Sequence, residues 1–167
     1  AALLPDADGA AHAHMAEDYK QAFHRLRGNG LVDEPLFPGI ADLVARLDGE
    51  GWLLGVATGK SDRGLRLCLD RHNMAHHFIT LQTADRHPSK PHPAMLHAAI
   101  AEAGETPARS WMIGDTIYDI EMGVAAGVRA VGVDWGYHHP AELIEAGAVA
   151  VLEQPVELIA CIEEIAR

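Results

Sequence analysis

Two carboxylates in the stretch WMIGDTIYDIEMG are spaced so that they could act together. Asp115 closes a short apolar run, and Asp119 lies four residues further on, in the first turn of an expected helix. This spacing turns both carboxylates to one side, and a helix N-terminus tolerates their negative charge. Mg²⁺ is bound by one or two such carboxylates, with water and phosphate oxygens completing its octahedron. The pattern therefore indicates a magnesium site, and an Asp that caps the helix beside an unrelated Asp is the alternative.

Two other loops offer groups that suit an anion. The stretch VATGK leads from an apolar run into Thr58 and Gly59, which supply a hydroxyl and backbone N–H groups at a helix start. In PSKPHP, prolines restrict the backbone around Lys90, so its ammonium group has less freedom than that of a lysine on a surface helix. Each loop alone is also compatible with an ordinary strand-to-helix turn or a solvated lysine. The two loops and the two aspartates together are stronger evidence for a functional site than any one of them alone.

The elements that must position these groups follow from alternating apolar and amphipathic stretches. Repeated strand–helix units predict an α/β domain, with a parallel sheet buried on both faces and right-handed crossovers. Ligands on such sheets bind beyond the carboxyl ends of the strands. Ser61 and Asp62 are expected to cap one helix. Helices are expected to end at Gly104, Gly127 and Gly147, each in the left-handed backbone conformation. Strands are predicted at 52–57, 78–81, 110–113, 129–133 and 148–152, and helices at about 40–50, 62–73, 92–103, 117–126, 140–146 and 156–166.

The composition describes a protein with one compact domain. Its 167 residues, 49% of them apolar and 22% charged, suffice for a single core. A formal net charge of −11 argues against a nucleic-acid or anionic-membrane surface, because both favour clustered Lys and Arg. Cys68 and Cys161 lie far apart and no apolar run approaches the roughly 20 residues of a membrane span, so a cytoplasmic location is expected. The eleven histidines show no zinc-finger spacing, so they are expected to face solvent or cap helices.

The three polar motifs together resemble those of a known family. VATGK, SKPHP and GDTIYD, in this order and with helices between them, resemble motifs II, III and IV of the haloacid dehalogenase-like (HAD) hydrolase superfamily. The longer stretches around them are similar to its phosphoglycolate phosphatase-like branch, over about residues 36–167. The resemblance implies a three-layer Rossmann-like core. It also implies hydrolysis of a phosphate monoester through a phosphoaspartyl intermediate, with Mg²⁺ as cofactor.

The same resemblance implies a role for each matching residue. Thr58 and the backbone of Gly59 would bind phosphate oxygens, and Lys90 would steady the nucleophile and the phosphoryl group. Asp115 would be the direct Mg²⁺ ligand, with Asp119 as its nearby or water-mediated partner. The implied catalytic residues are thus Thr58, Lys90 and Asp115. These roles agree with electrostatics, because phosphoryl transfer depends chiefly on positioning and charge stabilisation.

The nucleophile of this family belongs to an Asp-x-Asp-Gly-Thr motif at the end of an apolar strand. The stretch PDADGA matches it in three letters, but Ala10 replaces the Thr. Pro5 also fits a central strand poorly, because it cannot donate a ladder hydrogen bond. We therefore interpret Asp6 and Asp8 as a polar turn ahead of a cap helix, and we expect the nucleophile in an upstream segment. A capless enzyme that uses Asp6 is the alternative, and the spacing does not exclude it.

The N-terminal part of the chain resembles the second half of the family's helical cap. It consists of an amphipathic helix predicted over residues 10–27 and a linker, EPLFPG, at 34–39. The predicted division is a partial helical cap segment at 1–35 and a HAD-like core at 36–167. Without a nucleophile strand, the strands of motifs II and IV would leave two unpaired sheet edges facing a gap. We therefore expect poor activity of the chain alone, and a homodimer or swapped oligomer formed through these edges.

The predicted function is Mg²⁺-dependent hydrolysis of a small phosphorylated metabolite, with no nucleic-acid or membrane partner. Two alternatives are a haloacid dehalogenase, which needs no Mg²⁺, and a non-catalytic module that binds phosphate or a partner. The pair of Asp115 and Asp119 favours the phosphatase over the dehalogenase. The sequence does not identify the phosphate ester, because the cap that selects it is at best half present.

Overall fold

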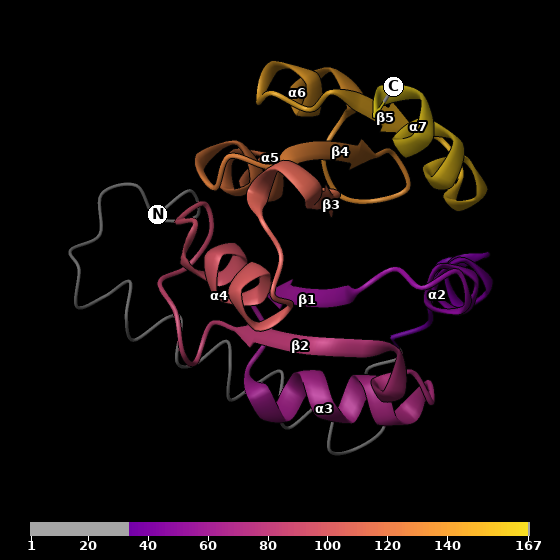
Figure 1. Cartoon of the computed structure of the whole chain (residues 1–167), viewed down its shortest axis with the longest axis vertical. Helices are drawn as coiled ribbons and strands as arrows, with labels where there is room; N and C mark the ends of the chain where they lie inside the picture. The colour runs from indigo at the N-terminus through magenta and orange to yellow at the C-terminus, as the bar shows by residue number, and fades with distance from the viewer. Residues whose placement is uncertain (1–33, 167) are drawn as a thin grey trace. The chain divides into compact units, whose positions relative to one another are not determined.

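A computed structural model describes residues 34–166 of the chain (Figure 1). The predicted helix at 10–27, the turn at Asp6 and Asp8, and the partial cap segment at 1–35 lie outside the described residues, apart from the last two of that segment. The described residues from 36 to 166 form one compact unit. Between residues 34 and 166, no helix is both long and apolar enough to cross a bilayer.

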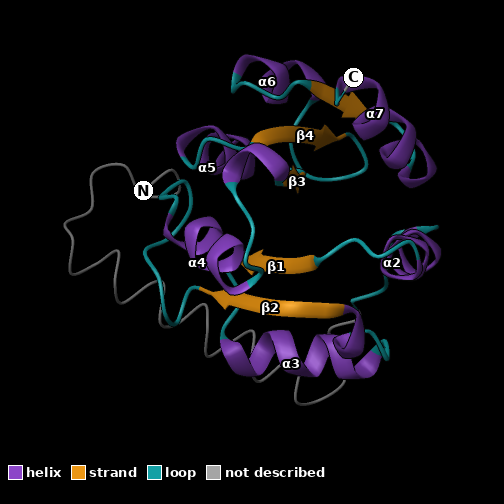
Figure 2. Cartoon of the chain, viewed as in Figure 1, coloured by secondary structure: helices purple, strands orange, loops and turns teal. Residues whose placement is uncertain are grey.

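Strands and helices alternate along this unit (Figure 2). The strands are β1 (Leu54–Thr58), β2 (Phe78–Thr83), β3 (Trp111–Gly114), β4 (Arg129–Val133) and β5 (Ala150–Leu152). The α-helices are α2 (Ile40–Gly49), α3 (Asp62–Arg71), α4 (Ala94–Glu102), α5 (Ile117–Ala125), α6 (Pro140–Glu145) and α7 (Leu158–Ile165). Three short 3₁₀ helices are η1 (Ala75–His77), η2 (Pro107–Arg109) and η3 (Pro155–Glu157). The alternation confirms the predicted α/β class.

Within residues 34–166, each predicted strand and helix is present, but some ends were predicted wrongly. The first strand begins at Leu54 and not at residue 52, because the Trp52 N–H donates to Leu47 O at 3.0 Å and closes the turn after α2. Strand β2 continues two residues beyond its predicted end at residue 81, through the buried polar side chains of Gln82 and Thr83. The last predicted helix, at 156–166, is divided into η3 and α7.

The predicted helix ends can be compared residue by residue. Ser61 caps α3 as predicted, since its Oγ accepts from the Gly64 N–H at 3.1 Å, whereas Asp62 is the first helical residue. The three glycines predicted to end helices all have positive φ, at Gly104, Gly127 and Gly147. These ends follow from local chemistry. A side-chain oxygen accepts a hydrogen bond from a free N–H at the helix start, and glycine, which has no Cβ, adopts the left-handed turn at the helix end.

Hydrogen bonding divides the strands into two parallel sheets. One sheet pairs β1 with β2, and the other has the order β3-β4-β5. Among the described residues, therefore, β1 has a neighbour on one edge alone, and so has β3 (Figure 1). The two free edges predicted from the sequence are present in this part of the chain.

Helices cover both faces of the sheets and give three layers. In β3, Met112 packs into a buried cluster with residues of α4 and α5. Its neighbours Trp111 and Ile113 point the other way and pack against a cluster to which α2, α7, β4 and β5 contribute. A third cluster joins α3 to β1 and β2. Strands covered on both faces read as continuous apolar runs, which explains the sequence pattern.

Candidate active site

Asp119 is fixed at the start of α5 by reciprocal hydrogen bonds with Thr116. Thr116 is the N-cap residue, and its Oγ1 accepts from the Asp119 N–H at 3.3 Å. Oδ2 of Asp119 in turn accepts from the N–H and the hydroxyl of Thr116, at 3.2 and 2.7 Å. This capping box satisfies free N–H groups at the helix start and sets the rotamer of the carboxylate. Asp119 therefore takes part in a helix cap, but not as the N-cap residue itself.

Lys90 forms a partly buried ion pair with the other oxygen of the same carboxylate. Its Nζ lies 2.5 Å from Oδ1 of Asp119, and the two side chains are 19% and 6% exposed. Lys90 lies in the loop between β2 and α4, so the pair joins two loops that are 29 residues apart in the sequence. The structure thus brings together two of the predicted site residues. It also shows that both oxygens of Asp119 are already bonded.

Asp115 lies one residue after β3 and is wrapped by the loop that follows β4. Its Oδ2 accepts from the Tyr137 N–H at 3.2 Å, and its backbone oxygen accepts from the His138 N–H at 3.1 Å. A Cβ added at Gly136 would lie 2.1 Å from the Cβ of Asp115, so this approach requires glycine. The Nδ1 of His138 accepts from the N–H of Ile117, the first residue of α5, at 3.1 Å.

The sequence predicted that the stretch WGYHHP at 135–140 approaches the rim of the site, but it gave no role to Gly136, Tyr137 or His138. The signal was the stretch WGYHHP directly after an apolar run, since carboxyl ends of neighbouring parallel strands lie at one edge of a sheet. β4 is the hydrogen-bonded neighbour of β3, which places this loop beside Asp115. His138 has the helix-capping role expected for histidines in this chain.

Thr58 is the last residue of β1 and Gly59 follows it, at the corresponding place in the other sheet. Oγ1 of Thr58 accepts from the Lys60 N–H at 3.2 Å, which shapes the turn into α3. A Cβ added at Gly59 would meet nothing within 4 Å, so the backbone there borders open space. The N–H of Ala84 donates to Lys60 O at 3.3 Å and links this turn to the loop that carries Lys90. Within residues 34–166, no hydrogen bond joins Thr58 directly to Lys90 or Asp115.

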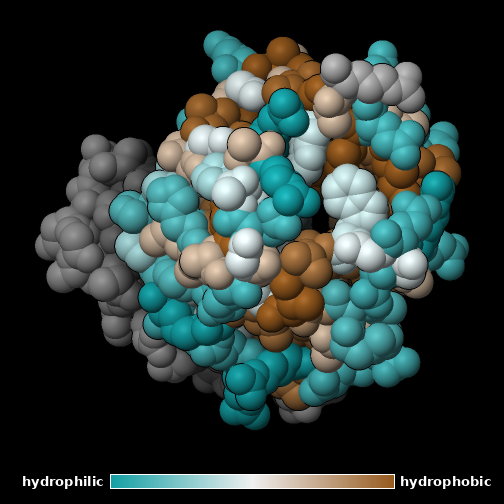
Figure 3. All heavy atoms as spheres, in the orientation of Figure 1, coloured by the Kyte–Doolittle hydropathy of each residue, from teal (hydrophilic) through white to brown (hydrophobic). Residues whose placement is uncertain are grey.

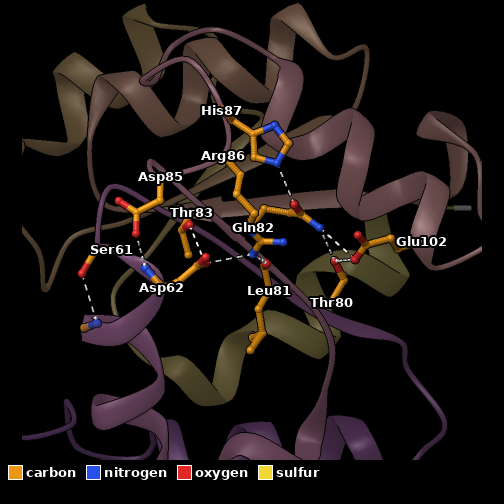
Figure 4. Close-up of polar contacts among 11 residues, drawn as sticks. Ser61, Asp62, Thr80, Leu81, Gln82, Thr83, Asp85, Arg86, His87 and Glu102 are labelled. Atoms are coloured by element: carbon orange, nitrogen blue, oxygen red, sulfur yellow. Dashed lines mark hydrogen bonds and ion pairs between the residues drawn. The ribbon is translucent and has the colours of Figure 1, made fainter.

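The loop that carries Lys90 is fastened to β2 and α4 by a chain of polar side chains (Figure 4). Gln82, which is 1% exposed, donates through Nε2 to Glu102 Oε2 and to Thr80 Oγ1, each at 2.8 Å. Its Oε1 therefore faces Nε2 of His87, 2.7 Å away, and this ring nitrogen must carry the hydrogen. His87 precedes Lys90 by three residues, so the chain of contacts holds the loop from which Lys90 extends.

Arg86 fastens the same loop to the start of α3 (Figure 4). Its guanidinium group donates to the backbone oxygen of Leu81 and lies 3.1 Å from Oδ1 of Asp62. The hydroxyl of Thr83 also donates to that oxygen, at 2.7 Å. This hydrogen bond is the main reason that the pKa of the Asp62 carboxyl lies below its ordinary value, with the Arg86 charge adding to the effect. The contacts tie together the loops after β1 and β2.

Replacing Glu102 with glutamine is expected to lower the melting temperature at pH 7 and to have no effect in acid. Hydrogen bonds from Thr80 and then Gln82 hold the pKa of the Glu102 carboxyl below its ordinary value of 4.5. A carboxyl whose pKa is lowered by folding contributes stability above its unfolded pKa and loses it as pH falls through the folded pKa. Thermal unfolding by circular dichroism, from neutral pH to about pH 3, measures this. Glu105→Gln is the control, and an equal difference at every pH would contradict the prediction.

Known proteins are similar to the chain in sequence. Residues 6–133 match the family described as haloacid dehalogenase-like hydrolase. The chain is 34% identical over 126 residues to the probable phosphatase IndB of Dickeya dadantii, an alignment covering 74% of this chain and 54% of that protein. It is 30% identical over 147 residues to a phosphoglycolate phosphatase of Synechococcus elongatus, covering 88% of this chain and 68% of that protein. The chain thus spans little more than half of the first relative and about two thirds of the second.

Solved structures show the same arrangement of strands and helices. A hydrolase from Pseudomonas syringae superposes with a TM-score of 0.81 at 26% identity, over 98% of this chain and 77% of that one. A predicted phosphoglycolate phosphatase from Haemophilus somnus superposes with a TM-score of 0.78 at 23% identity, over 86% of this chain and 65% of that one. These likenesses confirm the predicted Rossmann-like core.

Proposed function

The chain belongs to the haloacid dehalogenase-like hydrolases, and on that premise we propose that it hydrolyses a phosphate monoester with Mg²⁺ as cofactor. Its similarity to a probable phosphatase and to a phosphoglycolate phosphatase supports this reaction. We propose a small phosphorylated metabolite as substrate, with phosphoglycolate as the first ester to test. The proposed place of action is the cytoplasm.

The observation that carries the proposal is the ion pair of Lys90 and Asp119, with Asp115 four residues before Asp119. The pair joins the loop after β2 to the start of α5 after β3, so one cation and two carboxylates come from the segments that follow these two strands. A lysine ammonium group has three donors. While one binds Asp119, the others can bind a phosphoryl oxygen and the carboxylate that attacks it.

The donor set fits Mg²⁺. In residues 34–166 no three side chains of His, Cys, Asp or Glu gather into a group that could hold a metal ion. Mg²⁺ needs fewer protein ligands, since one or two carboxylates suffice when water and substrate phosphate fill the other positions. No donor among the described residues reaches Oδ1 of Asp115, so this oxygen would be the direct ligand. Asp119, with both oxygens bonded, would act through water. When bound, the ion offsets the negative charge of the phosphoryl group.

The chain's own residues would bind and orient the phosphoryl group. The Thr58 hydroxyl and the Gly59 N–H would donate to its oxygens, and Lys90 would stabilise its charge. The nucleophile in this proposal is an aspartate from a segment outside residues 34–166. Its carboxylate oxygen bonds to phosphorus as the ester P–O bond breaks, and the leaving alcohol takes up a proton. Water then cleaves the acyl phosphate, which releases inorganic phosphate and restores the carboxylate.

Asp115→Asn is expected to weaken Mg²⁺ binding at least about tenfold. The substitution removes the negative charge from the oxygen proposed as the direct ligand, while the amide can still accept the Tyr137 N–H. Isothermal titration with MgCl₂, with and without inorganic phosphate, measures the affinity. Asp134→Asn is the matched control, because Asp134 is an exposed carboxylate that follows β4 by one residue. Equal affinities for wild type and Asp115→Asn would contradict the assignment.

Turnover of p-nitrophenyl phosphate by the full chain tests the reaction itself. Weak or absent hydrolysis by the chain alone, unchanged in Asp6→Asn, is expected if the nucleophile lies elsewhere, and phosphate should still bind with Mg²⁺. Mg²⁺-dependent turnover that is lost in Asp6→Asn would support the phosphatase but place the nucleophile at Asp6. Failure to bind phosphate, or Mg²⁺-independent turnover of a 2-haloacid, would overturn the proposed function.

A further inference from the structure

A cavity of about 540 Å³, the α2 cavity, lies beside the start of α2 and the segments that follow β4 and β5. Its lining includes Phe37 and Pro38 before α2, Trp135 after β4, and Glu153 and Pro155 after β5. Figure 3 shows hydrophobic residues beside a hollow near the middle of the face in view, whereas the lining of the α2 cavity mixes aromatic rings, prolines and charged side chains. This volume and this mixture are typical of a site for a small organic molecule.

Hydrogen bonds fix two walls of the α2 cavity relative to each other. The Asp134 N–H donates to Leu152 O at 3.0 Å, which holds the segment with Trp135 next to the segment with Glu153. The N–H groups of Glu153 and of the residue after it both donate to Oε2 of Glu157, at 2.9 and 3.0 Å. Trp135 also packs against the buried cluster that contains Leu152. An aromatic ring held in this way needs little further ordering when a ligand binds.

The carboxylates of Asp42 and Glu153 give the α2 cavity a negative charge. Both residues line the cavity and are exposed. Within residues 34–166, neither carboxylate takes part in an ion pair or a hydrogen bond. The cation of the lining, Arg46, is already paired with Glu50, which lies 2.8 Å away. The lining therefore carries negative charge that a cationic ligand would balance.

The start of α2 on its own would favour an anion, because a helix N-terminus carries a partial positive charge. Gly39, the N-cap residue of α2, lines the cavity. Asp42 lies in the first turn of the helix, however, so this helix end already has a negative charge beside it. Glu153 adds a second carboxylate from another segment. An anion in the α2 cavity would thus be repelled by two carboxylates, while Arg46 is engaged by Glu50.

The aromatic rings favour an organic cation over a bare metal ion. In residues 34–166, no three side chains of His, Cys, Asp or Glu gather into a group that could hold a metal ion. An ammonium group is attracted to the face of an aromatic ring, and most strongly to that of tryptophan. Trp135 and Phe37 supply such rings in the α2 cavity, and Phe37 is 50% exposed.

We propose that the α2 cavity binds a small organic cation, an ammonium ion that carries apolar groups. Asp42 and Glu153 balance its charge, and its apolar groups contact the rings of Trp135 and Phe37. The inference is independent of the proposed function, because it involves neither Mg²⁺ nor phosphate.

Choline and its neutral counterpart test the proposal. Choline is a small quaternary ammonium ion, and 3,3-dimethyl-1-butanol has the same shape with carbon in place of nitrogen. Isothermal titration of each into the full chain, without Mg²⁺ or phosphate, measures the affinities. Choline should bind in a saturable way, and the neutral compound should bind about tenfold more weakly or less. Equal affinities would mean simple apolar adhesion, and they would overturn the proposal, as would a lack of saturable choline binding.

Replacing both carboxylates tests whether the cation is bound at the α2 cavity. Asp42→Asn/Glu153→Gln should weaken choline binding about tenfold and leave the neutral compound unaffected. The matched control is Glu163→Gln/Glu164→Gln, since these two residues are exposed on α7 and do not line the cavity. Choline affinity that is unchanged in the first double variant, or equally reduced in the control, would overturn the proposal.

The indole N–H signals of the tryptophans locate the bound cation. The chain has three tryptophans, and Trp135→Phe identifies the signal of Trp135 in a ¹⁵N spectrum. Choline should shift this signal in proportion to occupancy and leave those of Trp52 and Trp111 nearly unchanged, because neither residue lines the α2 cavity. Shifts confined to Trp52 or Trp111 would place the cation elsewhere and overturn the proposal.

Discussion

Lys90→Met is expected to lower the free energy of unfolding by about 3 kcal/mol and to abolish phosphate binding. The methionine fills a similar volume but leaves Oδ1 of Asp119 without its partner in a place where the carboxylate is 6% exposed. An unpaired buried charge is far more costly than the loss of an exposed ion pair. Urea denaturation measures the stability, and titration with inorganic phosphate in the presence of Mg²⁺ measures the binding.

A double variant separates the two effects of Lys90. In Lys90→Met/Asp119→Asn, the Asp119 carboxylate that loses its partner in the single variant is replaced by a neutral amide. Most of the lost stability should therefore return. Phosphate binding should not return, because the cation is still absent. If the double variant were as unstable as the single one, the instability would come from packing of the loop and not from the buried carboxylate of Asp119.

Gly114→Ala is expected to disrupt the site as strongly, although it introduces a single methyl group. An added Cβ would lie 2.1 Å from the Cβ of Asp119 and 2.6 Å from its Cγ. These atoms are held by the cap with Thr116 and by the pair with Lys90, so they cannot turn away without loss of both contacts. Overpacking of this kind costs about 1–3 kcal/mol or more. Mg²⁺ and phosphate titrations should show binding lost or weakened at least tenfold.

Gly49→Ala is the matched control for that substitution. Gly49 is the last residue of α2, and an added Cβ would meet nothing within 4 Å. Alanine in place of a helical glycine stabilises by roughly 0.5–1 kcal/mol, so this variant should melt slightly higher and bind ligands normally. If Gly114→Ala bound Mg²⁺ normally and kept its stability, the prediction would be wrong. The carboxyl end of β3 would then be able to move away from α5.

Much of the fold followed from the sequence because its signals are local. The cap by Ser61 and the left-handed stops at Gly104, Gly127 and Gly147 depend on residues within one turn of each helix end. The end of β2 could not be predicted in this way. Its last two residues are polar, and they are buried because partners elsewhere in the chain, among them Asp62, accept or donate hydrogen bonds.

The candidate site was predictable in part for the same reason. The family resemblance assigned Lys90 and Asp119 to one site, and the structure shows their contact. The cap between Thr116 and Asp119 is local, yet the sequence analysis considered an Asp as the capping residue, and the N-cap residue is Thr116. The loop around Asp115 comes from the next strand, so its contacts depend on strand order. The family resemblance supplied the roles of these residues, which their spacing alone left open.

The ion pair of Lys90 and Asp119 also bears on the order in which ligands can bind. Lys90 carries one positive charge and Asp115 and Asp119 two negative ones, so these three side chains sum to −1. A phosphate dianion approaching them is repelled overall, and the lysine is engaged before it arrives. A divalent cation bound beforehand reverses the sum to +1. Under the proposed function, cation and ester therefore add in sequence, the cation first, and phosphate affinity rises with Mg²⁺ concentration until the metal site is full.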